Sequence, residues 1–405
     1  MSTMPTVILT SPLEDSPVDD ATRRAWHVGR RVGAVVTALL LTLGAALWHA
    51  SGAIGEETFR ARPAPYWPVY DDVQVVAVEA GQVGLVPGPG EGPPPDADGL
   101  YGLAWNGGAG LLGAARTAPG GMVVRELTLV AGALPEVGVQ ASIESSYWVG
   151  EPSGLGLWYR NVLIAGSYPA WFVEAADATT VAVVVHGRNG SRRDGLRVVE
   201  ALHRLGVSAL VISHRNDATA LSGGTGRLGY GTSEWPDLEA AVTWAVHQGA
   251  TDVVLVGQSM GGAVVAAFLE ESPLARVVSR VVLDAPILSA EQVARSGSAR
   301  ALGLGAELPE PALTAAVLLA GARWGVDWGA ADYLDDTSWV RTPTLVFHGT
   351  ADPVVPLSQS RSLADAAPHL VTVAEVPGAG HLESWNVDRR AWTVALAAFM
   401  GATAE

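Results

Sequence analysis

Short apolar runs alternate with amphipathic segments from about residue 162 to the end of the chain. The apolar runs that predict strands are Val181–Val185, Val207–Ser213, Val253–Val256, Val281–Leu283, the stretch after Pro343, and Val371–Val376. Helices are predicted over Arg193–Leu205, after Ser233, over Ala263–Leu269 and over Asp388–Met400. This alternation predicts an α/β fold with a mostly parallel, doubly wound sheet, and a domain over residues 156–405.

A different pattern precedes this domain. Four short strands are predicted, separated by turn-rich stretches such as Pro87–Pro95; they are Asp72–Leu85, Leu103–Ala114, Gly121–Ala131 and Val137–Tyr147. We therefore expect a small β-rich module over residues 51–155, too short to be a propeller. The glycine-rich stretch Trp105–Gly110 favours a tight turn over a phosphate-binding loop.

The longest apolar stretch, Val32–Trp48, contains no charged residue and reaches the short end of the range for a transmembrane helix. Arginines cluster before it, at positions 23, 24, 30 and 31, whereas Glu56 and Glu57 follow it. The positive-inside rule then places a tail of residues 1–31 in the cytoplasm, a single-pass helix at 32–50 in the cell membrane, and the remaining chain outside.

A cleaved signal peptide is the alternative, because Ser51-Gly52-Ala53 offers small residues for cleavage. The leading segment is long for a signal peptide, which favours the anchor. On either interpretation, we expect a chain that begins near Gly55 to be soluble and active.

The run Val253–Val256 leads into Gly257-Gln258-Ser259-Met260-Gly261-Gly262. A strand that enters G-x-S-x-G and continues as a helix builds a nucleophile elbow, in which a serine sits on a strained turn. The turn closes only if the residues two positions either side are nearly free of side chain, and Gly257 and Gly261 meet that demand. Ser259 is thus a candidate nucleophile, and the alternative role is that of a helix N-cap.

Two further groups follow later strands. Asp352 lies in the loop after the strand that begins near Pro343, and His381 lies in the loop after Val371–Val376. The order Ser259, Asp352, His381 is that of nucleophile, acid and base in α/β-hydrolases. Asp284, at the end of Val281–Leu283, is the competing acid.

With its HG, GxSxGG, HGxxDxxVP and GxxH segments, the chain from about Val162 to Met400 resembles the α/β-hydrolase superfamily, most closely its serine aminopeptidase and monoacylglycerol lipase branch. The resemblance implies that Ser259 is the nucleophile, Asp352 the acid and His381 the base. It also implies oxyanion-hole N–H groups at Arg188, after the His186-Gly187 turn, and at Met260.

The guanidinium of Arg188 could bind an anionic group of a substrate, or could simply face solvent beside Arg192 and Arg193.

Between Asp284 and Pro343 the alternation of strands and helices lapses. This superfamily inserts its cap at that place, so a cap is expected at about residues 288–340. The tryptophans there suggest an apolar wall over the active site, and core packing is the alternative.

The charge balance excludes one class of function. All 25 basic residues are arginines, against 41 acidic residues and a net charge of −16, so nucleic-acid binding is not expected. The chain has no cysteine, which excludes a thiol nucleophile and disulfides, and no metal-ligand spacing is found.

We expect a serine hydrolase that cleaves a carboxylic ester in a small-molecule acyl substrate without a cofactor, by an acyl-enzyme route. The alternatives are an aminopeptidase or other amide hydrolase, which an acidic pocket for a substrate amine would favour, and a non-catalytic interaction module with the same fold. Substrate identity and oligomeric state stay open.

Overall fold

The computed structural model describes residues 20–62, 71–90, 92–146, 150–176, 179–221, 224–303 and 308–401. The chain divides into two compact units, Met1–Ala50 and Ser51–Glu405. Most of the predicted cytoplasmic tail, residues 1–19, lies outside the described residues, as does Tyr147 at the end of the fourth predicted strand.

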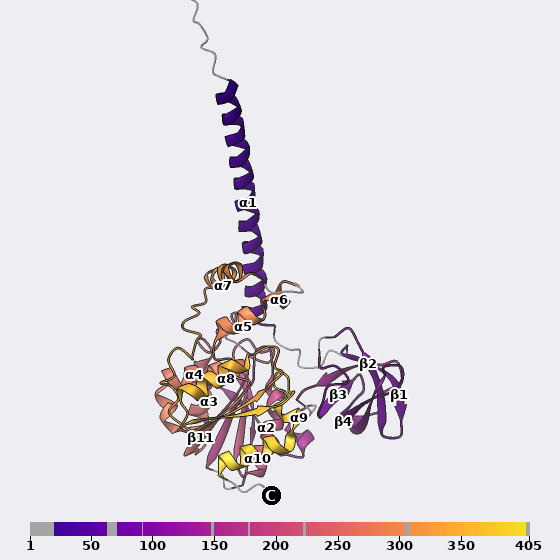
Figure 1. Cartoon of the computed structure of the whole chain (residues 1–405). Coiled ribbons are helices and arrows are strands. Elements are labelled where there is room, and N and C mark those ends of the chain that lie inside the picture. The colour runs from indigo at the N-terminus through magenta and orange to yellow at the C-terminus, as the bar shows by residue number, and fades with distance from the viewer. Residues whose placement is uncertain are drawn as a thin grey trace, which may run out of the picture. The chain divides into compact units, whose positions relative to one another are not determined.

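Helix α1 is longer than the predicted apolar segment. It runs from Asp20 to Phe59, and the span Arg23–Phe59 is long and apolar enough to cross a membrane (Figure 1). Leucines 39 to 41 are 64% to 70% exposed, which leaves a bare apolar surface on this part of the helix. By length and composition, α1 is therefore one helix that could span a bilayer.

The last turns of α1 belong to the second unit and are part of its core. Ser51, Ile54 and Phe59 are fully buried, and the Ser51 hydroxyl accepts a hydrogen bond from Arg323. The Phe59 ring lies against the rings of Tyr230, Trp324 and Trp328. A chain that begins near Gly55 would lack the buried Ser51 and Ile54, and its solubility and activity stay a prediction.

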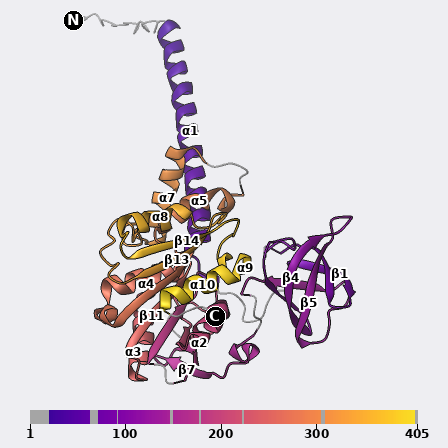
Figure 2. The ribbon, with the colours of Figure 1, turned by 60° about the horizontal axis from the view of Figure 1, so that its bottom comes forward.

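The β-rich module is a closed six-stranded antiparallel barrel with strand order β1-β2-β5-β4-β3-β6 (Figure 2). Its strands are β1 (Val73–Glu79), β2 (Gln82–Pro87), β3 (Tyr101–Trp105), β4 (Gly108–Thr117), β5 (Val123–Gly132) and β6 (Gln140–Glu144). Two predicted strands are in fact hairpins, because chain reversals at Gly81 and Gly107 divide them. Both glycines have positive φ, and the tight turn predicted at Trp105–Gly110 is confirmed.

The second half of the chain folds around an eight-stranded sheet of order β14-β13-β12-β11-β9-β10-β8-β7. Its strands are β7 (Arg160–Ile164), β8 (Tyr168–Val173), β9 (Thr180–Val185), β10 (Ser208–Ile212), β11 (Asp252–Gln258), β12 (Val278–Asp284), β13 (Thr344–Gly349) and β14 (Val371–Val376). Strands β9 to β14 are parallel, and β7 and β8 form an antiparallel edge that the sequence pattern did not indicate.

Helices cover both faces of this sheet. The helices are α2 (Leu196–Arg204), α3 (Trp235–His247), α4 (Met260–Glu271), α8 (Leu357–Ala366), α9 (Ser384–Val387) and α10 (Arg389–Met400), with short 3₁₀ turns η1 (Pro152–Leu155), η2 (Arg192–Gly195) and η3 (Pro273–Val277). One apolar core cluster joins the sheet to α3, α4 and α8, and another joins it to α2 and α10. The predicted doubly wound α/β fold is confirmed.

Between β12 and β13 the chain inserts α5 (Ala290–Ser296), α6 (Ser298–Ala301) and α7 (Glu310–Trp324), where the cap was predicted. The aromatic residues of this insertion pack inward. Tyr333 and Trp339 are buried, and Trp324 and Trp328 contact Phe59. Their contacts are those of core packing rather than of a tryptophan wall over a site.

Candidate active site

Ser259 occupies a strained turn between β11 and α4. Its backbone has φ 51° and ψ −118°, a conformation that costs a non-glycine residue free energy. A Cβ atom on Gly257 would lie 2.7 Å from the carbonyl oxygen of Gly261, and one on Gly261 would lie 2.3 Å from the carbonyl oxygen of Val185. Both glycines are therefore required for the turn to close, as the sequence pattern predicted.

Ser259, His381 and Asp352 form one hydrogen-bonded chain. The Oγ of Ser259 lies 2.9 Å from Nε2 of His381, and Nδ1 of the same ring lies 2.8 Å from Oδ2 of Asp352. The three residues follow β11, β13 and β14, whose carboxyl ends meet at one edge of the sheet. The side chain of His381 is 19% exposed, whereas that of Asp352 is 1% exposed. The chain of hydrogen bonds therefore runs from a buried carboxylate toward the surface.

The surroundings of Asp352 favour its charged form. Burial opposes ionisation, but hydrogen bonding with His348 and His381 holds the pKa of this carboxyl well below its usual range. The other oxygen, Oδ1, accepts the backbone N–H groups of Val354 at 2.8 Å and Val355 at 2.9 Å. The carboxylate is thus both ionised and fixed in orientation.

Asp284, the competing acid, makes no hydrogen bond to His381. Its nearest cation is Arg197, with 3.6 Å between Nη2 and Oδ2, and both of its carboxylate oxygens lack a hydrogen-bond partner among the described residues. Burial raises the pKa of Asp284, although Arg197 and His381 oppose the shift. The geometry therefore favours Asp352 over Asp284 as the partner of the histidine.

The loop after β9 lies directly against the elbow. A Cβ atom on Gly187 would lie 2.8 Å from the Cβ of Ser259, which brings the backbone of the next residue, Arg188, beside the serine. Met260 is the first residue of α4, where backbone N–H groups have no acceptor within the helix. The backbones of Arg188 and Met260 thus adjoin the serine, and their role as oxyanion donors stays a prediction.

The guanidinium of Arg188 binds the end of α1. Its Nη1 donates to the carbonyl oxygen of Glu57, and its Nη2 lies 3.4 Å from the Glu57 carboxylate. The backbone N–H of Arg62 donates to the side chain of Asn189 at 2.7 Å in the same loop. The Arg188 side chain is therefore held by the end of α1, which supports the loop.

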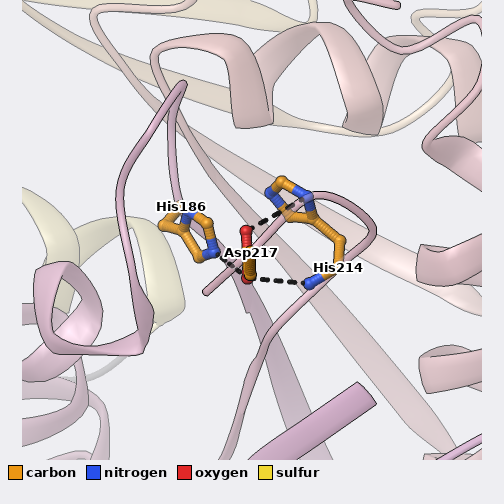
Figure 3. Close-up of side chains that lie close together, drawn as sticks. All are labelled: His186, His214 and Asp217. Carbon is orange, nitrogen blue, oxygen red and sulfur yellow. Dashed lines mark hydrogen bonds and ion pairs between the residues drawn. The ribbon is translucent and has the colours of Figure 1, made fainter. Parts of the chain in front are cut away.

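His186, at the head of this loop, belongs to a buried cluster that sequence spacing did not reveal (Figure 3). Its Nε2 lies 2.8 Å from Oδ2 of Asp217, and its ring stacks on that of His214 with 4.4 Å between ring centroids. Burial opposes protonation, but the charge of Asp217 raises the pKa of His186 to about 9. The cluster therefore contains a buried ion pair that holds the loop.

The same three side chains, His186, His214 and Asp217, could offer ligand atoms to a metal ion, because these atoms lie within 4.8 Å of one another. The hydrogen bonds do not favour that use. Nδ1 of His186 lies 2.9 Å from the carbonyl oxygen of Gly187 and Nε2 lies against the carboxylate, so both nitrogens are engaged as donors in the charged ring. A metal ion would have to displace this arrangement.

An acidic cavity of 290 Å³ lies elsewhere, lined by Glu270, Glu271, Asp332 and neighbouring residues. The two glutamates are at the carboxyl end of α4, a helix of 12 residues, and Ser259 precedes its amino end. The helix rise separates the two ends by about 18 Å. This cavity is thus not placed to bind an amine at the candidate active site.

The sequence profile of the alpha/beta hydrolase family matches residues 183–396, just over half of the chain. The protein therefore belongs to the alpha/beta hydrolase family and is a hydrolase. An uncharacterized protein of Mycobacterium tuberculosis strain H37Rv is 28% identical over 256 residues, which cover 62% of this chain and 76% of that protein.

Two solved structures show a similar fold. The esterase Pf2001 of Pyrococcus furiosus is 20% identical, with a TM-score of 0.49, and the match covers 62% of this chain and 94% of the esterase. Est1E of Butyrivibrio proteoclasticus, solved with ferulic acid, is 18% identical, with a TM-score of 0.44, over 60% of this chain and 97% of the other.

Proposed function

We propose that this protein is a serine hydrolase that cleaves carboxylic esters through an acyl-enzyme intermediate. The observation that carries the proposal is the hydrogen-bonded chain Ser259–His381–Asp352, with the serine on a strained elbow. The alternative role of Ser259, that of a helix N-cap, does not explain these features. An N-cap serine needs neither a positive φ nor glycines on both sides, and the structure gives Ser259 no side-chain cap bond.

The geometry supports a definite role for each residue. His381 takes the proton of Ser259 Oγ as the oxygen attacks the ester carbon, and Asp352 holds the ring in the tautomer whose Nε2 can accept that proton. The backbone N–H groups of Arg188 and Met260 stabilise the oxyanion, an effect of about 3 kcal/mol per donor. Water then attacks the acyl-enzyme by the same route, and no cofactor takes part.

An amide hydrolase is the second candidate, and an aminopeptidase needs an anionic group that binds the substrate amine on the acyl side. The acidic cavity at Glu270 and Glu271 is remote from Ser259. That cavity therefore gives no support to an aminopeptidase, and we propose the ester substrate. The ion pair of Arg188 with Glu57 likewise leaves no free guanidinium there for an anionic acyl group.

The test compares acyl esters of graded chain length with aminoacyl anilides, using the full chain in detergent. We expect ester hydrolysis in the wild type and a loss of several orders of magnitude in Ser259→Ala, with an unchanged unfolding midpoint. Faster cleavage of anilides than of esters would favour the amide hydrolase. Turnover retained by Ser259→Ala would overturn the role of the serine.

We further propose that α1 anchors the enzyme in the cell membrane, with its N-terminus in the cytoplasm and the hydrolase outside. The exposed leucines of α1 support insertion in the membrane, and the arginines at positions 23, 24, 30 and 31, which precede the apolar stretch of this helix, support the orientation. The burial of Ser51 and Ile54 speaks against cleavage at that point. The protein should resist carbonate extraction and be digested by protease added to spheroplasts, and protection from that protease would refute the orientation.

A further inference from the structure

A cavity of 510 Å³ lies between the barrel and the loop that carries His381. On the barrel side it is lined by residues that include Pro93, Pro94 and Asp98, and on the hydrolase side by residues that include Pro353, His381 and Glu383. Its volume is in the range of pockets that hold small molecules, about 300–1,000 Å³. The cavity thus joins a module outside the family match to a residue of the candidate active site.

The barrel side of the cavity is a proline-rich loop that the side chains of Arg125 and Asp72 hold by hydrogen bonds. Arg125 is fully buried behind the loop and donates to the carbonyl oxygens of Pro95 at 3.2 Å and Ala97 at 3.0 Å. The carboxylate of Asp72 accepts the backbone N–H of Gly92 at 2.9 Å. A loop rich in proline and held by two ionisable side chains is preorganised, as a binding wall must be.

The same loop is bonded to the His381 segment through Asn386. The side-chain amide of Asn386 donates to Leu100 O at 2.6 Å and to Ser145 O at 2.8 Å, and its oxygen accepts from Arg197 at 3.1 Å. A Cβ atom on Gly99 would lie 2.3 Å from the carbonyl oxygen of Asn386, so a glycine is required at this approach. The two walls of the cavity are therefore joined by specific contacts between buried groups.

We propose, on the basis of the proposed ester hydrolysis, that this cavity binds the alcohol half of the substrate. In acylation the Ser259 Oγ–carbon bond forms and the carbon–oxygen bond to the alcohol breaks. The proton that His381 took from the serine passes to the departing oxygen. The alcohol must therefore lie beside His381, and His381 is one of the residues that line the cavity. The barrel then selects the leaving group.

The lining of the cavity indicates which alcohols fit. Its prolines offer an apolar surface, and its acidic groups are Asp98 and Glu383, with no arginine among the described residues that line it. Asp98 is exposed, and the buried Arg125 behind it offsets part of its charge. We infer a preference for alcohols with an apolar body that are neutral or cationic, and rejection of anionic alcohols.

The test uses three esters of one acid that differ in the charge of the alcohol: a choline ester, its neutral isostere the 3,3-dimethylbutyl ester, and a 3-sulfopropyl ester. We expect the full-length enzyme to cleave the sulfopropyl ester with the lowest kcat/KM. Asp98→Asn should lower the ratio of choline to dimethylbutyl kcat/KM about two- to fivefold, the range of an exposed charge pair. Asp96→Asn is the matched control, because Asp96 is exposed on the same loop and near Arg125 but does not line the cavity.

A second variant tests the shape of the cavity independently of charge. Pro94→Trp should lower kcat/KM for esters of bulky alcohols and leave methyl esters and the acyl-chain preference nearly unchanged. The inference is overturned if Asp98→Asn behaves as Asp96→Asn does, or if Pro94→Trp alters acyl preference as much as alcohol preference. In either case Ser259-dependent ester hydrolysis would stand, whereas a wild type that cleaves no ester would refute the proposed function itself.

Discussion

Replacement of Asp352 by asparagine should inactivate the enzyme through a forced amide orientation. Oδ1 of Asp352 accepts two backbone N–H groups, at 2.8 Å and 2.9 Å, so the amide oxygen of an asparagine must take that place. The amide NH₂ group then faces Nδ1 of His381, where Oδ2 now accepts at 2.8 Å. Because two donors cannot pair, the ring adopts the tautomer with its proton on Nε2, which cannot deprotonate Ser259.

The loss should be about 10⁴-fold in kcat, the size reported for a wrong histidine tautomer in a serine triad. Asp284→Asn should act differently, because it removes the carboxylate that lies 3.6 Å from the buried Arg197. Leaving a buried charge unpaired costs about 3–5 kcal/mol of stability, but His381 keeps its partner. We expect this variant to unfold at a lower temperature and, when folded, to retain kcat within about tenfold.

The assay measures kcat on a saturating activated ester and the thermal unfolding midpoint of both variants in the same detergent. Asp352→Asn should keep its midpoint within a few degrees and lose activity, and Asp284→Asn should show the reverse. If Asp284→Asn is the less active folded enzyme, the acid lies on β12 and the assignment of Asp352 is wrong.

Two further predictions concern stability. A chain that begins at Gly55 lacks the buried Ser51 and Ile54. Its unfolding free energy should be at least about 2 kcal/mol lower than that of a chain that begins at residue 45, because the burial of Ile54 is lost. Thermal unfolding of the two chains tests this, and equal midpoints would contradict the packing of α1. The raised pKa of His186, about 9 against 6.5, implies about 3 kcal/mol of stabilisation that is complete below pH 6.5 and is lost as pH rises through 9. Asp217→Asn should flatten that dependence, and an unchanged pH profile would show that the pair contributes little.

The parallel strands β9 to β14 and several helices of the hydrolase were predictable because each has a local signal, whereas the antiparallel strands β7 and β8 were not indicated. The runs around Val253–Val256 and Val371–Val376 are valine-rich, and glycine or proline marks their ends. The hairpin at Gly81 was missed, and Leu103–Ala114 was predicted as one strand although a tight turn was predicted within it. Where the apolar pattern continues through a turn, the glycine is the only residue that indicates the turn.

The contacts that join distant segments had no such signal. His186 and Asp217 are 31 positions apart, and the bond between Asn386 and Ser145 spans 241 positions. Neither pair follows a motif, since each depends on how separate elements are placed by the fold. The continuation of α1 into the hydrolase core was hidden for the same reason, because Phe59 packs against Tyr230, Trp324 and Trp328, which lie far from it in the sequence.

The central claim is that Ser259 forms a covalent intermediate, and mass spectrometry of the protein treated with a fluorophosphonate tests it most directly. A fluorophosphonate traps an activated serine as a stable adduct. We predict one adduct on the peptide that contains Ser259, formed in the wild type, strongly slowed in Asp352→Asn and absent in Ser259→Ala. An adduct on another residue, or none in a protein that hydrolyses esters, would contradict the account.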